Sequence, residues 1–202
     1  MTTARAIYNG SRANRVVALT FDDGYSPVAL RQILAILKRE HVAATFFPYG
    51  WATSNDPPGW KMVTAAGFPI GNHTLTHATL TSLTPAEVTE QMMRGRRTID
   101  LYSGGKSGNY MRPPGGAFNA PTSRAIAKAG YPVIVLWDVD TFDWQGPSVA
   151  TITTRAIRGT NGSIVLMHSG PPSTSKALPA IIANYRSRGF TFVTIPELLG
   201  IQ

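Results

Sequence analysis

Short apolar runs alternate with amphipathic segments along almost the whole of this 202-residue sequence. Each apolar run has the length of a buried β-strand, and each amphipathic segment repeats its apolar residues with the period of an α-helix. Strands separated by helices predict parallel βαβ units, because neighbouring parallel strands need a long crossover connection. The predicted strands span 16–21, 44–48, 69–72, 109–112, 133–137, 163–168 and 190–194, and the predicted helices span 27–40, 58–66, 85–102, 120–129, 148–158 and 175–187.

The ends of several predicted helices carry residues that start or stop a helix. Thr84 and Glu87 have the spacing of a capping box, in which each side chain bonds the backbone of the other residue. Gly67, Gly130 and Gly189 each follow a helical segment, where a left-handed residue is expected. No Pro/Ser-rich linker divides the chain, so we expect one domain over residues 1–202. Seven strands with outer helices indicate a barrel or a doubly wound sheet, and both place the working site at the carboxyl ends of the strands.

The composition limits the chemistry of this domain. Apolar residues make up 43% of the chain and charged residues 15%, as in globular proteins, and no apolar run is long enough to cross a membrane. There is no cysteine, so any metal must be held by His, Asp or Glu. The net charge of +8 favours an acidic partner, but the basic residues are scattered and form no recognised nucleic-acid motif. We therefore expect no nucleic-acid partner and no insertion into a membrane.

The aspartates, in contrast, are grouped at the ends of predicted strands. Asp22 and Asp23 close the first predicted strand, and Asp138, Asp140 and Asp143 follow the fifth. These are five of the seven aspartates in the chain, and three of its four histidines also follow strands. Two adjacent carboxylates repel each other at the edge of a core, so the pair in the first strand calls for a nearby cation. The grouping indicates an active site at this edge.

His73 and His77 follow the third predicted strand, in the sequence HTLTH. Alone this spacing is weak evidence, because two histidines at i and i+4 share one face of a helix and often occur by chance. An aspartate from another strand end completes a His/His/Asp set, the usual composition of an open catalytic zinc site, and Asp23 is the candidate third ligand. Asp22 then remains free as a general base, and the nearby cation would keep its carboxylate ionised.

Two further residues complete a hydrolytic site. Arg112 ends the fourth predicted strand and begins the sequence RPPGG, where it is placed to orient the Asp22 carboxylate and to favour its charged form. His168 ends the sixth predicted strand. A single histidine there is more often structural than catalytic, but an aspartate of the neighbouring strand end would hold its imidazolium, as a general acid requires. The sequence leaves open whether Asp140 or Asp143 is that aspartate.

Five ordered motifs, TFDDG, HTLTH, RPPGG, DTFDW and LMH, resemble those of the polysaccharide deacetylases of carbohydrate esterase family 4. The resemblance covers about residues 16–199 and implies a single polysaccharide deacetylase catalytic domain with a distorted (β/α)7 barrel. It also implies metal-dependent hydrolysis of acetyl groups on a glycan. These are either the N-acetyl groups of N-acetylglucosamine units in peptidoglycan or chitin, or the O-acetyl groups of xylan.

The resemblance assigns roles on the metal side of the site. It makes Asp22 the base and Arg112 the residue that positions this base. It gives the metal to Asp23, His73 and His77, and we expect one divalent ion there, zinc in preference to cobalt or nickel.

On the acid side the resemblance makes His168 the general acid and Asp143 the carboxylate that tunes this histidine. Leu166 matches the leucine that lines the acetyl pocket. Trp144 belongs to the same motif as Asp143. Its side chain could equally well pack in the core or bind the face of a sugar ring.

Two positions depart from the family pattern. Gly115 stands where the third motif usually has an aromatic residue, so the backbone N–H that helps to hold the oxyanion is kept while the wall beside it becomes more flexible. Tyr25 replaces the proline that often follows TFDDG, close to the base. We expect both residues, together with Trp144 and Leu166, to contact the substrate.

The favoured function is N-deacetylation of N-acetylglucosamine units in peptidoglycan or chitin by a monomeric enzyme. The alternatives are an O-acetyl esterase on acetylxylan, an enzyme for a small N-acyl or amide substrate, and a non-catalytic glycan-binding module of the same fold. The basic charge favours an anionic cell wall, and hence peptidoglycan. The first ten residues lack the apolar core of a signal peptide. We expect a cytoplasmic protein or a mature form, and the resemblance favours a secreted or cell-wall-associated protein whose leader is absent from this sequence.

Overall fold

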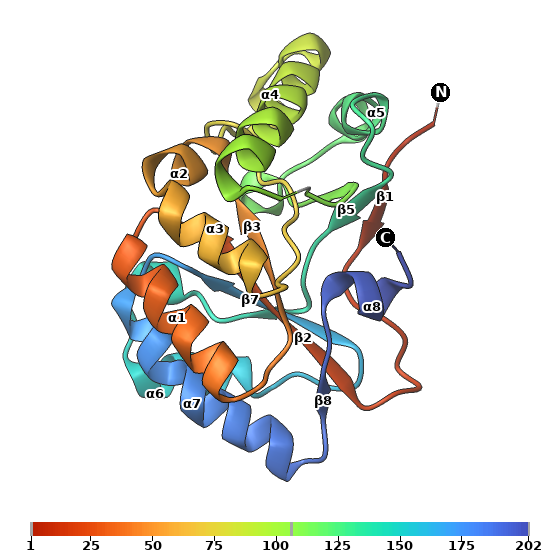
Figure 1. Ribbon diagram of the computed structural model, residues 1–202. Coiled ribbons are helices and arrows are strands. Elements are labelled where there is room, and N and C mark those ends of the chain that lie inside the picture. Colours follow the sequence, from red (N-terminus) through yellow and green to blue (C-terminus); the bar gives the residue numbers. More distant parts are fainter. Residues whose placement is uncertain (1, 106, 202) are drawn as a thin grey trace.

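The computed structural model describes residues 2–105 and 107–201, and it confirms the predicted α/β fold with parallel strands and outer helices (Figure 1). The strands are β1 (Arg5–Ile7), β2 (Val16–Asp23), β3 (Ala44–Pro48), β4 (Tyr110–Met111), β5 (Val133–Val135), β6 (Val139–Asp140), β7 (Ser163–His168) and β8 (Thr191–Phe192). The α-helices are α1 (Pro27–Arg39), α2 (Gly50–Asn55), α3 (Pro57–Ala65), α4 (Pro85–Ser103), α5 (Ala120–Lys128), α6 (Val149–Ala156), α7 (Pro172–Ser187) and α8 (Ile195–Leu199). Three short 3-10 helices lie at Leu80–Ser82, Pro114–Gly116 and Asp143–Gln145.

The strands form two parallel sheets, ordered β1-β5-β4 and β3-β2-β7-β6, with β8 also paired to β2. Single parallel bridges from Ile70 to Phe46 and from Asn72 to Met111 connect β3 to β4. In the described ranges the strand ladders therefore do not close into one continuous ring. The arrangement is that of a strongly distorted barrel, in which isolated bridges and irregular chain replace part of the wall.

Two of the predicted strands differ from the observed ones. The segment 69–72 makes only its two single bridges, because Pro69 has no N–H to donate and Gly71 has no side chain to pack in a ladder. The segment 133–137 is a strand only as far as Val135, and the chain then crosses to the other sheet as β6. Four strands and α-helices of the described residues were not predicted, namely β1, β6, α2 and α8, and each is too short to show a period in the sequence.

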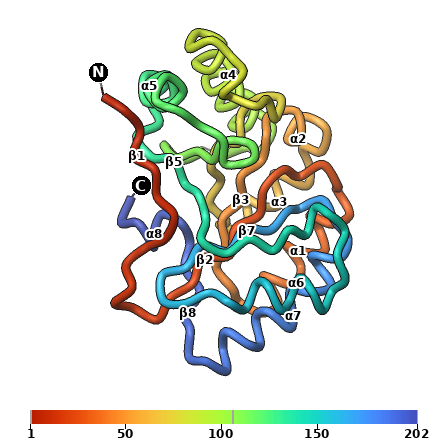
Figure 2. The backbone as a smooth tube through the Cα atoms, turned by 180° about the vertical axis from the view of Figure 1, so that it is seen from behind, coloured from red at the N-terminus to blue at the C-terminus, as the bar shows by residue number. Residues whose placement is uncertain are grey.

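The centre of the molecule is β2, with β3 and β7 on either side and helices packed outside them (Figures 1 and 2). Its largest apolar cluster joins these strands to the buried faces of α1 and α7. The capping box of Thr84 and Glu87 is present at the start of α4, as predicted. No helix in the described part of the chain is long and apolar enough to cross a membrane.

Candidate active site

The polar residues predicted for the site meet at the carboxyl ends of β2 and β7. Asp22 and Asp23 are the last two residues of β2, and both are buried. Asp22 is the register partner of His168, the last residue of β7. The alignment of these parallel strands thus brings two residues that are 146 positions apart into adjacent places.

A His/His/Asp cluster lies beside this pair. Candidate ligand atoms of Asp23, His73 and His77 are all within 4.8 Å of one another. The Oδ1 atom of Asp23 lies 3.2 Å from Nε2 of His77 and 3.6 Å from Nε2 of His73. The structure therefore brings together the three residues that the sequence predicted as metal ligands.

The surroundings of these atoms fit a divalent metal ion. Oδ1 of Asp23 is buried and accepts no hydrogen bond of good geometry, so an acceptor with high affinity for a cation is left over. Nδ1 of His73 is 2.7 Å from the carbonyl oxygen of Arg112 and must donate its proton to it, which leaves the Nε2 lone pair facing the cluster. Imidazole nitrogens and a carboxylate oxygen are the donors that zinc and similar ions take.

The electrostatics of the cluster agree with this assignment at two of its members. Burial acts to raise the pKa of Asp23, but the interactions with His77 and His73 outweigh it and hold this pKa below its ordinary value. Burial also lowers the pKa of His73, so its ring is neutral, as a ligand must be. The pKa of His77 is raised, mainly by its contact with Asp23.

The two histidines do not lie on a helix, although their spacing alone would suggest one. The segment 73–77 is irregular, and Thr74 and His77 have left-handed backbones with φ of 75° and 61°. Asp23, at the end of β2, is also left-handed, with φ of 73°. Such angles are uncommon outside glycine and persist only where the surroundings enforce them.

Arg112 is fully buried and occupies the space between the two sheets. One of its terminal nitrogens donates to Oδ1 of Asp22 at 2.6 Å and to Thr20 Oγ1 at 2.9 Å. Nε donates to the carbonyl oxygen of Val135, and the other terminal nitrogen donates to that of Leu136. Bonds on both sheets thus hold the guanidinium, and it presents a fixed positive charge to the Asp22 carboxylate.

His168 is held by Asp143, which settles the choice that the sequence left open. Its Nδ1 atom donates to Oδ1 of Asp143 at 2.6 Å, and its backbone N–H donates to Oδ2 at 2.8 Å. Thr174 donates to the same Oδ2 from α7. Burial lowers the pKa of His168, but the hydrogen bond and charge of Asp143, together with the charges of Asp22 and Asp23, outweigh it and raise this pKa to about 9.

The other two aspartates of this group face elsewhere. Asp138 pairs with Arg12 at 2.7 Å and accepts from Ser163 and from the backbone of Ile164. Asp140 accepts from the indole of Trp137 at 3.1 Å and from a backbone N–H. Both are therefore structural, and only Asp143 of the three reaches the site.

The predicted substrate-contacting residues differ in their exposure. Leu166 is buried two residues before the end of β7, on the same side of the strand as His168. Gly115 has a left-handed φ of 62° with open space where a side chain would begin. Tyr25 and Trp144 are 54% and 57% exposed, so both side chains are accessible to a ligand.

Comparison with known proteins places this geometry in a family. A family profile described as Polysaccharide deacetylase matches residues 9–134. The chain belongs to the polysaccharide deacetylase family. The chain is 36% identical over 191 residues to the peptidoglycan-N-acetylglucosamine deacetylase PgdA of Listeria monocytogenes, an alignment that covers 94% of this chain and 40% of that protein. It is 32% identical over 209 residues to a chitooligosaccharide deacetylase of Bradyrhizobium, covering 96% of this chain and 95% of that protein.

The fold of this deacetylase-family chain is similar to that of a solved pseudoenzyme. The structure is BA3943 of Bacillus anthracis, described as a CE4 family pseudoenzyme, with a TM-score of 0.90, 31% identity and coverage of 97% of this chain and 69% of that one. The chain spans about two fifths of the length of the first curated relatives that it matches. The chain therefore shares the family and the fold of these proteins.

Some residues that hold the deacetylase-type site carry no signal of their own in the sequence. Thr20 lies within the strand that bears the TFDDG motif, so its contact with Arg112 was predictable in principle. Thr174 and Gln91 contact the site from helices that are distant along the chain. Their sequence neighbours show no motif, and only the packing of α7 and α4 reveals them.

Proposed function

We propose that this protein hydrolyses the N-acetyl groups of N-acetylglucosamine units in a polysaccharide, with one bound divalent metal ion. The observation that carries the proposal is the meeting of three groups at one sheet edge. These are the Asp23/His73/His77 cluster, the Asp22–Arg112 pair and the Asp143–His168 pair. A base, a metal site and an acid are what hydrolysis of an unactivated amide requires.

The metal belongs with Asp23, His73 and His77, and zinc is the proposed ion because these donors suit it, with cobalt and nickel as alternatives. When bound, such an ion polarises the acetyl carbonyl and lowers the pKa of water in its vicinity. The backbone N–H of Gly115 is the proposed second donor to the oxyanion, a contribution of about 3 kcal/mol for a well-placed group.

Asp22 is the proposed general base. Its carboxylate accepts a hydrogen bond from Arg112 at 2.6 Å, and this buried cation holds it in a fixed orientation. The water proton passes to Asp22 as the oxygen attacks the acetyl carbon. Because Arg112 is itself held by backbone carbonyls, the base has little freedom to turn away.

His168 is the proposed general acid. Its Nδ1 is committed to Asp143, so only Nε2 is available to donate a proton, which goes to the departing nitrogen as the carbon–nitrogen bond breaks. The products are acetate and a free amine on the sugar. A pKa of about 9 keeps the ring protonated at neutral pH, as this role requires.

The exposure of side chains predicted to lie at the site favours a polymer as the substrate. Tyr25, Trp144 and His77 are all substantially exposed, and aromatic side chains at such positions suit the faces of sugar rings. The relatives act, by their names, on peptidoglycan and on chitooligosaccharides. We propose peptidoglycan before chitin, since the chain has a net charge of +8, and we propose that it acts outside the cell as a monomer.

A non-catalytic glycan-binding module is the second candidate, and the similarity to a CE4 family pseudoenzyme favours it. Acetate release from an N-acetylglucosamine oligomer distinguishes a deacetylase from a binding module. We expect wild-type protein to release acetate, to lose this activity with a chelator, and to regain it on addition of zinc. Binding of the oligomer without acetate release would establish the module instead.

The role of Asp22 is tested with a matched pair of variants. We expect Asp22→Asn to lower the rate of acetate release about 10²–10⁴-fold while zinc binding persists, because only the proton acceptor is lost. Asp140→Asn, in which the same change is made beside Trp137, is expected to keep wild-type activity. Full activity in Asp22→Asn would refute its role as base.

A further inference from the structure

The two histidine ligands lie on a segment that has no helical or strand hydrogen bonds of its own. None of the N–H groups of residues 73–77 donates to the carbonyl four residues earlier, as it would in a helix. The N–H of His73 bonds the carbonyl of Pro48, that of Thr74 bonds Asn72 Oδ1, and that of His77 bonds Thr74 Oγ1. The spacing of the two histidine rings therefore depends on groups outside the regular elements.

One side chain of α4 accounts for the two remaining N–H groups. Oε1 of Gln91 accepts from the backbone of Leu75 at 3.1 Å and of Thr76 at 3.2 Å. Nε2 of the same amide donates to Thr76 Oγ1 at 3.1 Å. Both ends of the amide thus bind the middle of the segment between the two ligands.

Two other contacts complete this clamp on the segment. The carbonyls of Thr74 and Leu75 accept from the first residues of α2, Gly50 at 2.9 Å and Trp51 at 3.0 Å. On α4, Gly95 allows close approach, because a Cβ there would lie 2.8 Å from the carbonyl carbon of Thr74. The segment is therefore pressed between two helices.

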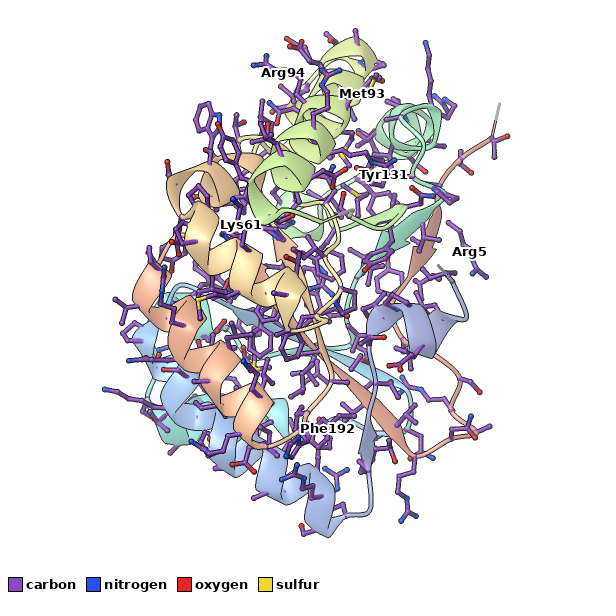
Figure 3. The ribbon with its side chains drawn as sticks, viewed as in Figure 1. Arg5, Lys61, Met93, Arg94, Tyr131 and Phe192 are labelled. Atoms are coloured by element: carbon purple, nitrogen blue, oxygen red, sulfur yellow. The ribbon has the colours of Figure 1, made fainter. Side chains whose placement is uncertain are left out.

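The face of α4 that holds the segment is distinct from its outer face. Met93 and Arg94 project away from the molecule (Figure 3). The next residue, Gly95, is buried and faces Thr74. Tyr131 lies beside α4 in Figure 3. It bonds Asn72, which directly precedes the segment, and Arg96 of the helix. The segment is thus anchored to α4 at its start and in its middle.

We infer that Gln91 is a positioning residue for the metal site, one that holds His73 and His77 in ligand geometry in the absence of a helix. The left-handed backbones of Thr74 and His77 would relax without such a clamp, since isolated chains rarely adopt them. The inference rests on the proposed function insofar as Asp23, His73 and His77 bind the metal. It predicts that metal affinity depends on a side chain that touches no ligand ring.

The test compares four proteins. Gln91→Leu removes the acceptor, whereas Gln91→Glu supplies a carboxylate oxygen as acceptor for the same two N–H groups. Glu90→Leu is the control, since Glu90 pairs with Arg94 on the outer face. Zinc affinity is measured by competition with a chromophoric chelator. Hydrogen exchange of a peptide covering residues 73–77 is measured on each metal-free protein.

We expect the zinc dissociation constant to rise about 10–100-fold in Gln91→Leu, the range found when partners of metal ligands are removed. It should stay within about threefold of wild type in Gln91→Glu and in Glu90→Leu, because the acceptor to the two N–H groups is kept in one and untouched in the other. Exchange in residues 73–77 should become faster only in Gln91→Leu. Wild-type affinity or wild-type exchange in Gln91→Leu would overturn the inference.

A second variant covers the case in which Gln91→Leu does not fold. Gly95→Ala favours the helix, because alanine has the higher helix propensity, yet its methyl group must displace Thr74. We expect it to weaken zinc binding at least about tenfold, and unchanged binding would count against the clamp. Wild-type zinc binding without acetate release would refute the proposed function alone, and a wild-type protein that binds no zinc would refute both.

Discussion

The site has an acid half, made of Asp143 and His168, and a metal half, made of the Asp23/His73/His77 cluster and the Asp22–Arg112 pair. The two halves are held in position by different means. His168 sits at the end of the regular strand β7, and the carboxylate of Asp143 is held by direct hydrogen bonds from His168 and Thr174. In the metal half, His73 and His77 lie on irregular backbone that depends on neighbouring elements for support, and both Asp23 and His77 have positive φ angles. We therefore expect the acid half to be sensitive to changes in the reacting groups themselves. The metal half should also be sensitive to residues outside it.

We expect the largest effect from removal of the general acid, which should abolish the function of one half and leave the other half intact. His168→Ala removes the proposed acid. The side chain of His168 bonds Asp143 and makes no hydrogen bond to the proposed metal ligands. We expect kcat for acetate release to fall about 10²–10⁴-fold. Zinc affinity should remain unchanged, as measured by chelator competition. A large loss of zinc binding would show that the halves are not independent.

The next effect concerns the stability of the metal half. Arg112→Met leaves the buried Asp22 carboxylate without its cation, and breaking such a pair costs about 3–5 kcal/mol. We expect this loss in the unfolding free energy of the metal-free protein, measured with denaturant. The double variant Arg112→Met/Asp22→Asn should recover part of it, because the uncompensated charge is gone. Strict additivity of the two changes would contradict the pairing.

The acid half should make stability depend on pH. His168 has an ordinary pKa of 6.5; burial lowers this pKa, but Asp143, Asp22 and Asp23 together outweigh burial and raise it to about 9 in the folded protein. A raised pKa stabilises the fold fully below about pH 6.5, and this stabilisation is lost as the pH rises through about 9. The loss is about 3 kcal/mol, at about 1.4 kcal/mol for each pKa unit.

This dependence is measured by denaturant unfolding of the metal-free protein between pH 6 and pH 10. His168→Gln is the matched control, since it cannot titrate in this range. The difference between the two proteins should shrink steadily across the window. A difference that stays constant with pH would show that Asp143 does not hold a charged imidazole.

The smallest effect is expected at the exposed edge of the site, outside both halves. Trp144→Ala removes an aromatic face that is 57% exposed and, in our interpretation, available to a sugar ring. We expect KM for an N-acetylglucosamine oligomer to rise about 2–10-fold, which corresponds to about 0.5–1.5 kcal/mol. The value of kcat should be unchanged, since no reacting group is touched. An unchanged KM would exclude this tryptophan from substrate binding.

Much of this organisation was determined by the sequence alone. The alternation of apolar runs and amphipathic segments predicted the parallel α/β fold, because each period reflects the burial of one face of a strand or helix. The ends of those strands then predicted Asp22, Asp23 and His168 as neighbours. Local chemistry was equally readable, as the capping box that begins α4 shows.

Only the tertiary structure decided the matters that depend on contacts between distant elements. Asp143, and not Asp140, reaches His168, because the chain turns after β6 and directs the two carboxylates to different partners. The histidines of HTLTH lie on a clamped irregular segment and not on a helix, because α4 and α2 supply its hydrogen bonds. Spacing along a chain records local periodicity, but it does not record which distant side chain will satisfy a buried N–H.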